Sequence, residues 1–129
     1  MSFVPENPLE EALLRGTRSP MARREFFRML LVSDLVVVGQ KSEDGRLKIV
    51  SSERDGRKYV SAFTSAARLK NHVHKTVNTL TMNGRMLLER TRGVTVLINP
   101  SEEYPAELTP ELIAEMLETK DVSFKTLLN

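Results

Sequence analysis

The stretch that decides the fold is Lys58–Lys70, with the sequence KYVSAFTSAARLK. Its first half is a strand-like run that ends at Phe63, and Thr64-Ser65 follows immediately with a helical pattern behind it. Threonine and serine cap helices because their side-chain oxygens accept hydrogen bonds from the free N–H groups of the first turn. We therefore expect a strand that turns directly into a helix at Thr64-Ser65.

Upstream, Asp55-Gly56 is the strongest hairpin signal, because both central residues of a type I′ turn need positive φ. The turn predicts that Arg46–Ser52 pairs antiparallel with the strand ending at Phe63, with Arg54 opposite Arg57. Ser51 then opposes Val60, and Ile49 opposes Ala62. One face of the pair carries Leu47, Ile49, Val60 and Ala62, and the other carries Val50, Tyr59 and Phe63. Since both faces are apolar, helices, another copy of the chain or a partner should cover the second face.

Toward the N-terminus, Asn7-Pro8 and Ser19-Pro20 each combine a capping residue with a first-turn proline. They predict a short helix that stops at Gly16 and a second helix from about Pro20 to Val32, with Ala22, Phe26, Met29 and Leu30 as its apolar stripe. The β-branched run Leu35–Val38 then predicts a strand buried on both faces.

Toward the C-terminus, the segment His72–Thr81 is ambiguous, and we expect it to be irregular or extended. Asn83 is expected to cap a short helix, Val94–Ile98 to be a buried strand, Ser101–Leu108 a loop, and Thr109-Pro110 to begin the last helix.

The order of these elements predicts an α+β fold in one domain, residues 1–129. It has a small mixed β-sheet, a three-stranded antiparallel meander plus a later strand, packed with four to five helices. The tail 121–129 either docks on the body or leads to a missing second domain.

The composition limits the chemistry. The 129 residues include no cysteine, which excludes disulfides, thiolate metal sites and cysteine nucleophiles. The N-terminus has no signal-peptide pattern and no apolar run is long enough to cross a bilayer, so we expect no membrane contact, and a cytoplasmic location is compatible with this composition. The net charge is +2, and the arginines crowded between Arg15 and Arg28 are best explained as a solvated helix face. Without an aromatic-interleaved basic stripe, nucleic acid is not an expected partner.

No catalytic or metal-binding constellation emerges. His72 and His74 would need a carboxylate such as Glu89 or Glu102 to hold a metal ion. Ser65 loosely resembles a nucleophile elbow but lacks the flanking glycines, and the six glycines form no nucleotide-binding motif. We therefore expect no catalytic residues, no metal and no cofactor, and predict that the chain is not an enzyme.

Three polar residues stand at the ends of predicted strands: Thr64, Ser65 and Asn99. If the two strand ends meet at one edge of the sheet, these residues could line a shallow pocket at a helix N-terminus, which attracts anions. The competing interpretation is local, with Thr64 or Ser65 capping the helix and Asn99 shaping a turn.

With these segments in hand, the chain resembles the N-terminal domain of the SseB (enhanced serine sensitivity) family. The resemblance is carried by NPLEEALL (7–14), AFTSAARL (62–69), VLINP (96–100) and TPELIAEML (109–117), with Phe63-Thr64-Ser65 and Asn99-Pro100 as its most specific parts. It implies a bacterial cytoplasmic protein with no established catalytic mechanism, often followed by a further C-terminal domain.

The leading functional hypothesis is a non-enzymatic binding or protein-interaction module. It would bind a protein partner, or associate with itself, through the sheet face bearing Val50, Tyr59 and Phe63. The alternative is a small-molecule sensor that binds an anionic metabolite at the Thr64-Ser65 corner. The sequence does not identify the ligand, the partner, the oligomeric state or the pathway.

Overall fold

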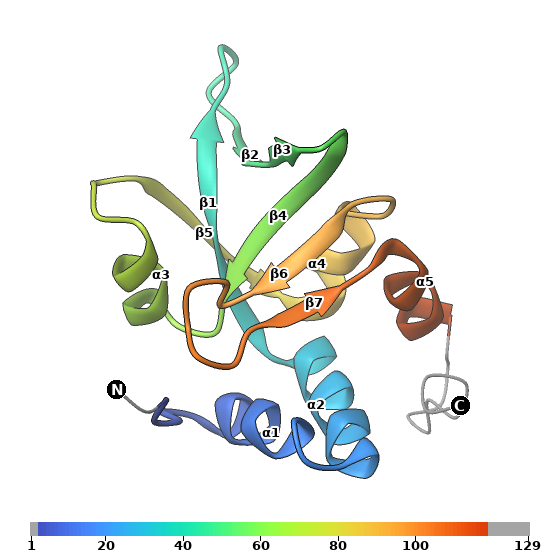
Figure 1. Ribbon diagram of the computed structural model, residues 1–129. Coiled ribbons are helices and arrows are strands. Elements are labelled where there is room, and N and C mark those ends of the chain that lie inside the picture. The colour runs from blue at the N-terminus through green and yellow to red at the C-terminus, as the bar shows by residue number, and fades with distance from the viewer. Residues whose placement is uncertain (1–2, 119–129) are drawn as a thin grey trace.

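The computed structural model describes residues 3–118 and shows a mixed sheet packed with helices, as predicted for an α+β fold (Figure 1). The helices in this range are α1 (Pro8–Gly16), α2 (Pro20–Val32), α3 (Ala66–His72), α4 (Gly84–Arg90) and α5 (Pro110–Glu118). The strands are β1 (Asp34–Lys41), β2 (Leu47–Ile49), β3 (Ser52–Arg54), β4 (Arg57–Phe63), β5 (Asn78–Asn83), β6 (Thr95–Ile98) and β7 (Ala106–Leu108). The predictions for the tail 121–129 lie outside the described residues.

The helix starts follow from side-chain caps. Asn7 Oδ1 accepts a hydrogen bond from the N–H of Glu10 at 2.8 Å, and Ser19 Oγ accepts one from Ala22 at 3.4 Å. Asn83 caps α4 in the same way. The predicted helices are confirmed, but the stripe predicted for α2 is partly wrong. The buried residues of α2 are Phe26, Phe27, Leu30 and Leu31, because α2 packs against both α1 and α4.

The sheet runs in the order β2-β1-β4-β6-β7, with β3 paired to β4 and β5 paired to β1. Strands β4 and β6 are parallel, with Ala62 opposite Ile98, and the other pairs are antiparallel. Because parallel strands end at the same edge of a sheet, the residues that follow Phe63 and Ile98 emerge side by side.

The structure corrects the prediction of one strand at Arg46–Ser52, because this segment is split in two. The turn at Asp55-Gly56 has the expected positive φ of 54° and 77°, and Arg54 opposes Arg57 as predicted. Beyond that hairpin, however, β1 takes the place beside β4, with Val37 opposite Ala62. The split segment fills the wedge where β1 and β4 diverge: β2 pairs with the end of β1, and β3 with the start of β4.

The physical reason lies in composition. Strand β1 carries consecutive valines and is buried from Leu35 to Val37, so it gains more from a central position than the polar segment does. Ile49 therefore opposes Gly39 and does not oppose Ala62.

The structure also settles one segment that was ambiguous and differs from expectation in another. The ambiguous segment His72–Thr81 becomes the end of α3, a connection and most of β5. The expected loop Ser101–Leu108 includes the short strand β7 at the sheet edge.

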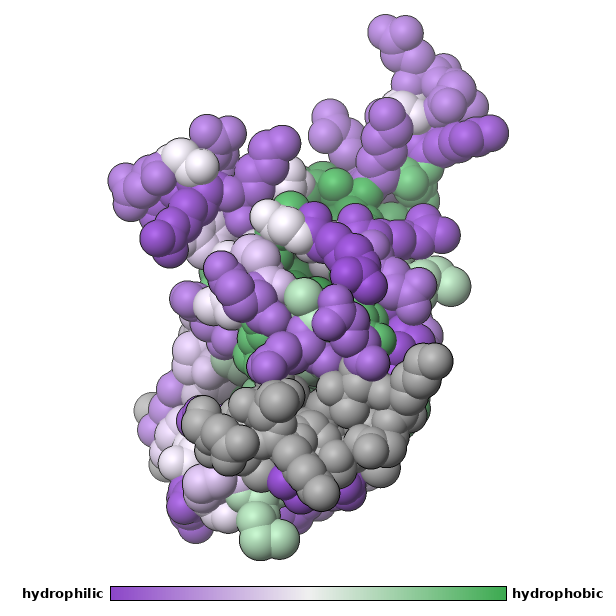
Figure 2. All heavy atoms as spheres, turned by 90° about the vertical axis from the view of Figure 1, so that its right-hand side faces the viewer, coloured by the Kyte–Doolittle hydropathy of each residue, from purple (hydrophilic) through white to green (hydrophobic). Residues whose placement is uncertain are grey.

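Hydrophobic packing divides the molecule into layers. On one face of the sheet, Val37, Val60, Ala62, Val96 and Ile98 join the main core with residues of α1, α2, α4 and α5. On the other face a smaller cluster of Val36, Phe63 and Leu69 holds α3. Figure 1 shows α3 apart from the other helices. Figure 2 views the side of the molecule away from α3, where the surface is mostly hydrophilic. The α3 face is therefore the thinly covered one among the described residues.

Candidate functional site: a corner cluster and a sheet groove

The strand ends bring Thr64 and Asn99 together. The Asn99 side chain accepts a hydrogen bond from the Thr64 N–H at 3.2 Å and donates one to Thr64 Oγ1 at 2.9 Å. Asn99 is fully buried and has a φ of 50°, a left-handed conformation that asparagine tolerates better than most residues. Its side chain thus joins the ends of β4 and β6.

Ser65 has a separate role at the same corner. Its Oγ accepts a hydrogen bond from the Arg68 N–H at 3.1 Å, so it is the N-cap of α3. The helix behind this cap has seven residues, Ala66–His72. These contacts agree with the local interpretation, in which Ser65 caps the helix and Asn99 shapes a turn.

The same corner holds a buried ion pair that the sequence analysis did not anticipate. Arg68 donates from Nη2 to Glu10 Oε1 at 2.9 Å and from Nε to Glu10 Oε2 at 3.1 Å. Glu10 has no exposed surface and Arg68 only 8%. Glu10 also accepts from the Thr64 hydroxyl, so it connects α1 with the strand-to-helix corner.

The guanidinium of Arg68 has further partners on the N-terminal segment and on the loop after β6. It donates to the Val4 carbonyl at 2.7 Å and to Glu102 at 3.1 Å, and it lies 4.6 Å from the centre of the Phe3 ring. Phe3 in turn packs edge-on against Tyr104. The corner cluster, Glu10, Thr64, Arg68 and Asn99 with these neighbours, therefore ties segments that are far apart in the chain.

The corner cluster lowers the pKa of the Glu10 carboxyl group. Burial by itself would raise the pKa of Glu10, but the hydrogen bonds from Arg68 and Thr64 outweigh it and hold the pKa below its ordinary value of 4.5. The Glu10 carboxylate raises the pKa of Arg68 correspondingly. Both groups are therefore charged at neutral pH.

These contacts bear on the predicted anion site at Thr64, Ser65 and Asn99. Each of the three side chains already has a partner, and the nearest charged group to Thr64 is the Glu10 carboxylate, which repels anions. The anion-sensor hypothesis stays a prediction, and the geometry counts against it. Among residues 3–118, no hydrogen bond joins Ser65 to a histidine, and no group of three His, Asp or Glu side chains is placed to hold a metal.

The second predicted site, the sheet face, contains a groove of about 490 Å³ on the α3 side. All three predicted interface residues, Val50, Tyr59 and Phe63, line it. Their exposure differs: Val50 is 38% exposed, Tyr59 is half-buried, and Phe63 is only 1% exposed because α3 covers it. Val50 and Tyr59 are thus available for contact, while Phe63 supports the floor.

The apolar lining residues of the groove are mostly valines, and we call them its floor; its basic lining residues are all exposed, and we call them its rim. Its walls are β1, β4, the segment between β2 and β3, and the connection from α3 to β5. Its lining comprises Val38, Gly39, Gln40, Lys41, Val50, Ser52, Tyr59, Ser61, Phe63, His72, Val73, Lys75, Val77 and Asn78. The ring of His72 lies 5.4 Å from that of Phe63. A volume of this order lies within the range of sites that bind small molecules.

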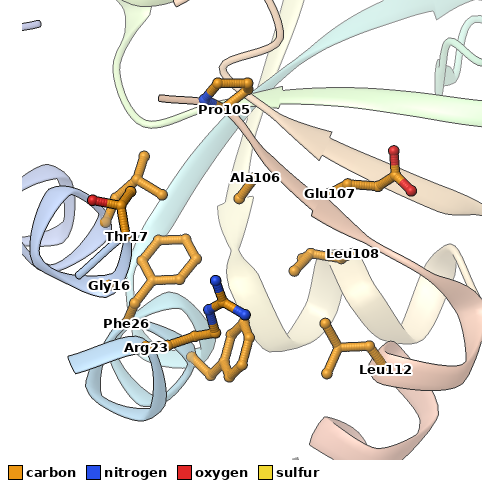
Figure 3. Close-up of a pocket in the computed structure, with 11 residues that line it drawn as sticks. Gly16, Thr17, Arg23, Phe26, Pro105, Ala106, Glu107, Leu108 and Leu112 are labelled. Carbon is orange, nitrogen blue, oxygen red and sulfur yellow. The ribbon is translucent and has the colours of Figure 1, made fainter. Parts of the chain in front are cut away.

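A smaller hollow of about 230 Å³ lies between α2 and β7 (Figure 3). Figure 3 shows Phe26 and Arg23 on one side of it and Leu108 and Leu112 on the other. Phe26 and Leu108 belong to the main hydrophobic core, so we interpret this hollow as incomplete packing at the sheet edge.

Comparison with known proteins places these features in a family. The family described as "SseB protein N-terminal domain" matches residues 9–115, which is most of the chain. The chain belongs to the SseB family. Among curated proteins, two relatives named "Protein SseB", from Escherichia coli (strain K12) and Shigella flexneri, are each 30% identical over 119 residues. The alignments cover 87% of this chain and 46% of each relative, so the chain spans about half the length of the relatives it matches.

No solved structure matches this SseB-family chain significantly. Within the described residues, none of the helices has the length and apolar character needed to cross a bilayer.

Three of the four motifs behind the resemblance meet in the corner cluster. Glu10 lies in NPLEEALL, Thr64 and Arg68 lie in AFTSAARL, and Asn99 lies in VLINP. Arg68 lies next to the apolar residue Leu69. This is the one sequence signal that could have suggested a buried ion pair. The motifs that identify the SseB family in this chain therefore build its framework, and the groove lies outside them apart from Phe63.

Proposed function

We propose that this SseB-family chain is a non-enzymatic protein-interaction module that binds its partner at the groove on the α3 face of the sheet. The observation that carries the proposal is that Val50, Tyr59 and Phe63 line one groove. An open sheet face with exposed apolar side chains is a typical protein contact surface. The bacterial cytoplasm, which the family resemblance implies, is part of the proposal.

The pairing within the corner cluster favours this assignment over the competing anion site. Its polar groups are paired with one another, so it stabilises the fold and offers little for a substrate to bind. The groove, in contrast, combines an aliphatic floor with the polar side chains of Gln40, Ser52 and Ser61 on its surface. A partner can therefore find both apolar contact and hydrogen bonds there.

The test uses Tyr59→Glu, which places a charge on the groove floor. Its matched control is Met86→Glu, since Met86 is 47% exposed on α4 and lies outside the groove lining. We expect a protein from the native bacterial extract to be retained by the wild type and by Met86→Glu and lost by Tyr59→Glu, and the purified partner to bind in the same pattern. Circular dichroism should show both variants folded.

Self-association at the same face is the second form of the proposal. Light scattering would then give a mass above that of one chain for the wild type and the mass of one chain for Tyr59→Glu. A wild-type chain that is monomeric, and that retains no protein in a Tyr59-dependent way, would contradict the proposed function.

A further inference from the structure

We propose that the groove binds an acidic segment of a partner protein, with an aliphatic side chain seated between carboxylates. This inference rests on the proposed function and adds the chemistry of the partner. It starts from the charges at the groove. The ionisable lining residues with basic side chains are Lys41, His72 and Lys75, and none of the lining residues is Asp or Glu.

The basic character extends beyond the groove. A neighbouring hollow shares Val73, Lys75 and Val77 with it and adds Lys70 and His74, again without an acidic residue. Within residues 3–118, the ion pairs of the structure do not involve Lys41, Lys70 or Lys75. These lysines therefore contribute an uncompensated positive potential along one side of the molecule.

The sequence explains how this asymmetry arises in a chain of net charge +2. Residues 56–88 contain six Lys and Arg residues, namely Arg57, Lys58, Arg68, Lys70, Lys75 and Arg85, and no Asp or Glu. Arg68 is neutralised within the corner cluster by Glu10 and Glu102. The acids of the chain thus lie outside residues 56–88, the segment that supplies His72 and Lys75 to the groove. Lys41 comes from a different segment and is followed by Glu43 and Asp44, which do not line the groove.

The floor of the groove decides between two kinds of acidic partner. Single-stranded nucleic acid requires aromatic rings on which successive bases stack. Phe63 is buried and the His72 ring lies against it, so Tyr59 is the remaining ring on the floor. The other apolar lining residues are Val38, Val50, Val73 and Val77, which suit an aliphatic side chain. The combination favours a peptide over a nucleic acid.

The experiment selects ligands without assuming one. A phage-displayed library of random peptides is enriched on the immobilised full chain, and the recovered peptides are synthesised and titrated by fluorescence anisotropy. We expect peptides rich in Asp and Glu around an aliphatic residue. The variant Lys41→Glu/Lys75→Glu should bind them at least tenfold more weakly, and tenfold corresponds to about 1.4 kcal/mol. Lys48→Glu/Arg92→Glu, which changes the net charge equally outside the groove lining, should bind them nearly as well as the wild type.

The outcomes separate the two proposals. Peptides that depend on Tyr59 but are neutral or basic, or that ignore the charge reversal at Lys41 and Lys75, overturn the acidic partner and leave the interaction groove intact. A library that yields no enrichment, or peptides that bind Tyr59→Glu equally well, overturns both. Oligothymidylate that binds in a Tyr59-dependent way more tightly than the selected peptides would replace the peptide with nucleic acid.

Discussion

Glu10 is the residue on which the corner cluster depends. Its two carboxylate oxygens accept hydrogen bonds from Arg68, from Thr64 and from the backbone N–H of Glu6. Removing one member of a buried ion pair leaves the other charge without compensation, whereas replacing both with apolar groups is often neutral. The cluster should therefore show strong coupling between its two charges.

We predict that Glu10→Leu destabilises the chain by about 3–5 kcal/mol, and that adding Arg68→Met restores part of the loss. Urea unfolding of the wild type, both single variants and the double variant gives the coupling free energy. The control is Glu25→Ala, which removes the exposed Glu25–Arg28 pair and should cost less than about 1 kcal/mol. Additive effects of Glu10→Leu and Arg68→Met would contradict the assignment of a coupled pair.

The lowered pKa of Glu10 also predicts a pH dependence. A carboxyl group whose pKa is lower in the folded chain stabilises that state fully above its ordinary pKa and loses the contribution as pH falls through the lowered value. The wild type should therefore exceed Glu10→Gln in stability at neutral pH. The gap should shrink as the pH falls below 4.5, the ordinary value. Urea unfolding across this range measures the gap, and a gap independent of pH would show that Glu10 contributes no titrating charge.

At the scale of elements, sequence signals predicted the helix starts and the turn, where the contacts span only a few residues. Asn7, Ser19 and Asn83 cap helices, and Asp55-Gly56 forms the expected turn, because these contacts depend on near neighbours in the chain. Strand pairing, in contrast, depends on which segments of the chain compete to pair with the same strand. The register from Asp55-Gly56 held only as far as Ser52 opposite Tyr59, since β1 then displaced the polar segment.

The contact between α2 and α4 gives a prediction at the same scale. A Cβ atom on Gly84 would lie 1.8 Å from the Leu30 carbonyl oxygen, so the start of α4 rests directly on the backbone of α2. Gly84→Ala should force the two helices apart and cost about 1–3 kcal/mol or more. The control is Gly45→Asn, at an open turn where the left-handed backbone accepts asparagine. Equal thermal unfolding midpoints for the two variants would contradict the close approach.

At the scale of the whole molecule, a mixed sheet packed with helices was predictable and the corner cluster was not. Strand alternation alone places Tyr59 and Phe63 on one face, because they lie four residues apart on β4. The sequence could not show that α3 covers only the Phe63 end of that face, since this depends on how the helix packs in three dimensions. Nor could it pair Glu10 with Arg68, which are 58 residues apart and joined only by folding.

The unequal layers predict unequal local stability. The main core joins four helices to one sheet face, whereas α3 is held by the small cluster of Val36, Phe63 and Leu69. Phe63→Leu should leave a cavity under α3 and cost about 1–3 kcal/mol, with most of the loss appearing as local opening of α3. Hydrogen exchange should then be faster in α3 and at residues 72–78, the groove wall, while amides of α1 and α2 keep their protection.

Tyr59→Glu is the matched comparison for this experiment, because Tyr59 lies on the same strand and the same face but is not part of that small cluster. It should weaken partner binding while leaving exchange in α3 unchanged. Phe63→Leu should weaken binding through the loosened wall. If exchange in Phe63→Leu rises evenly across all helices, α3 unfolds only with the whole molecule, and the groove wall is as stable as the core.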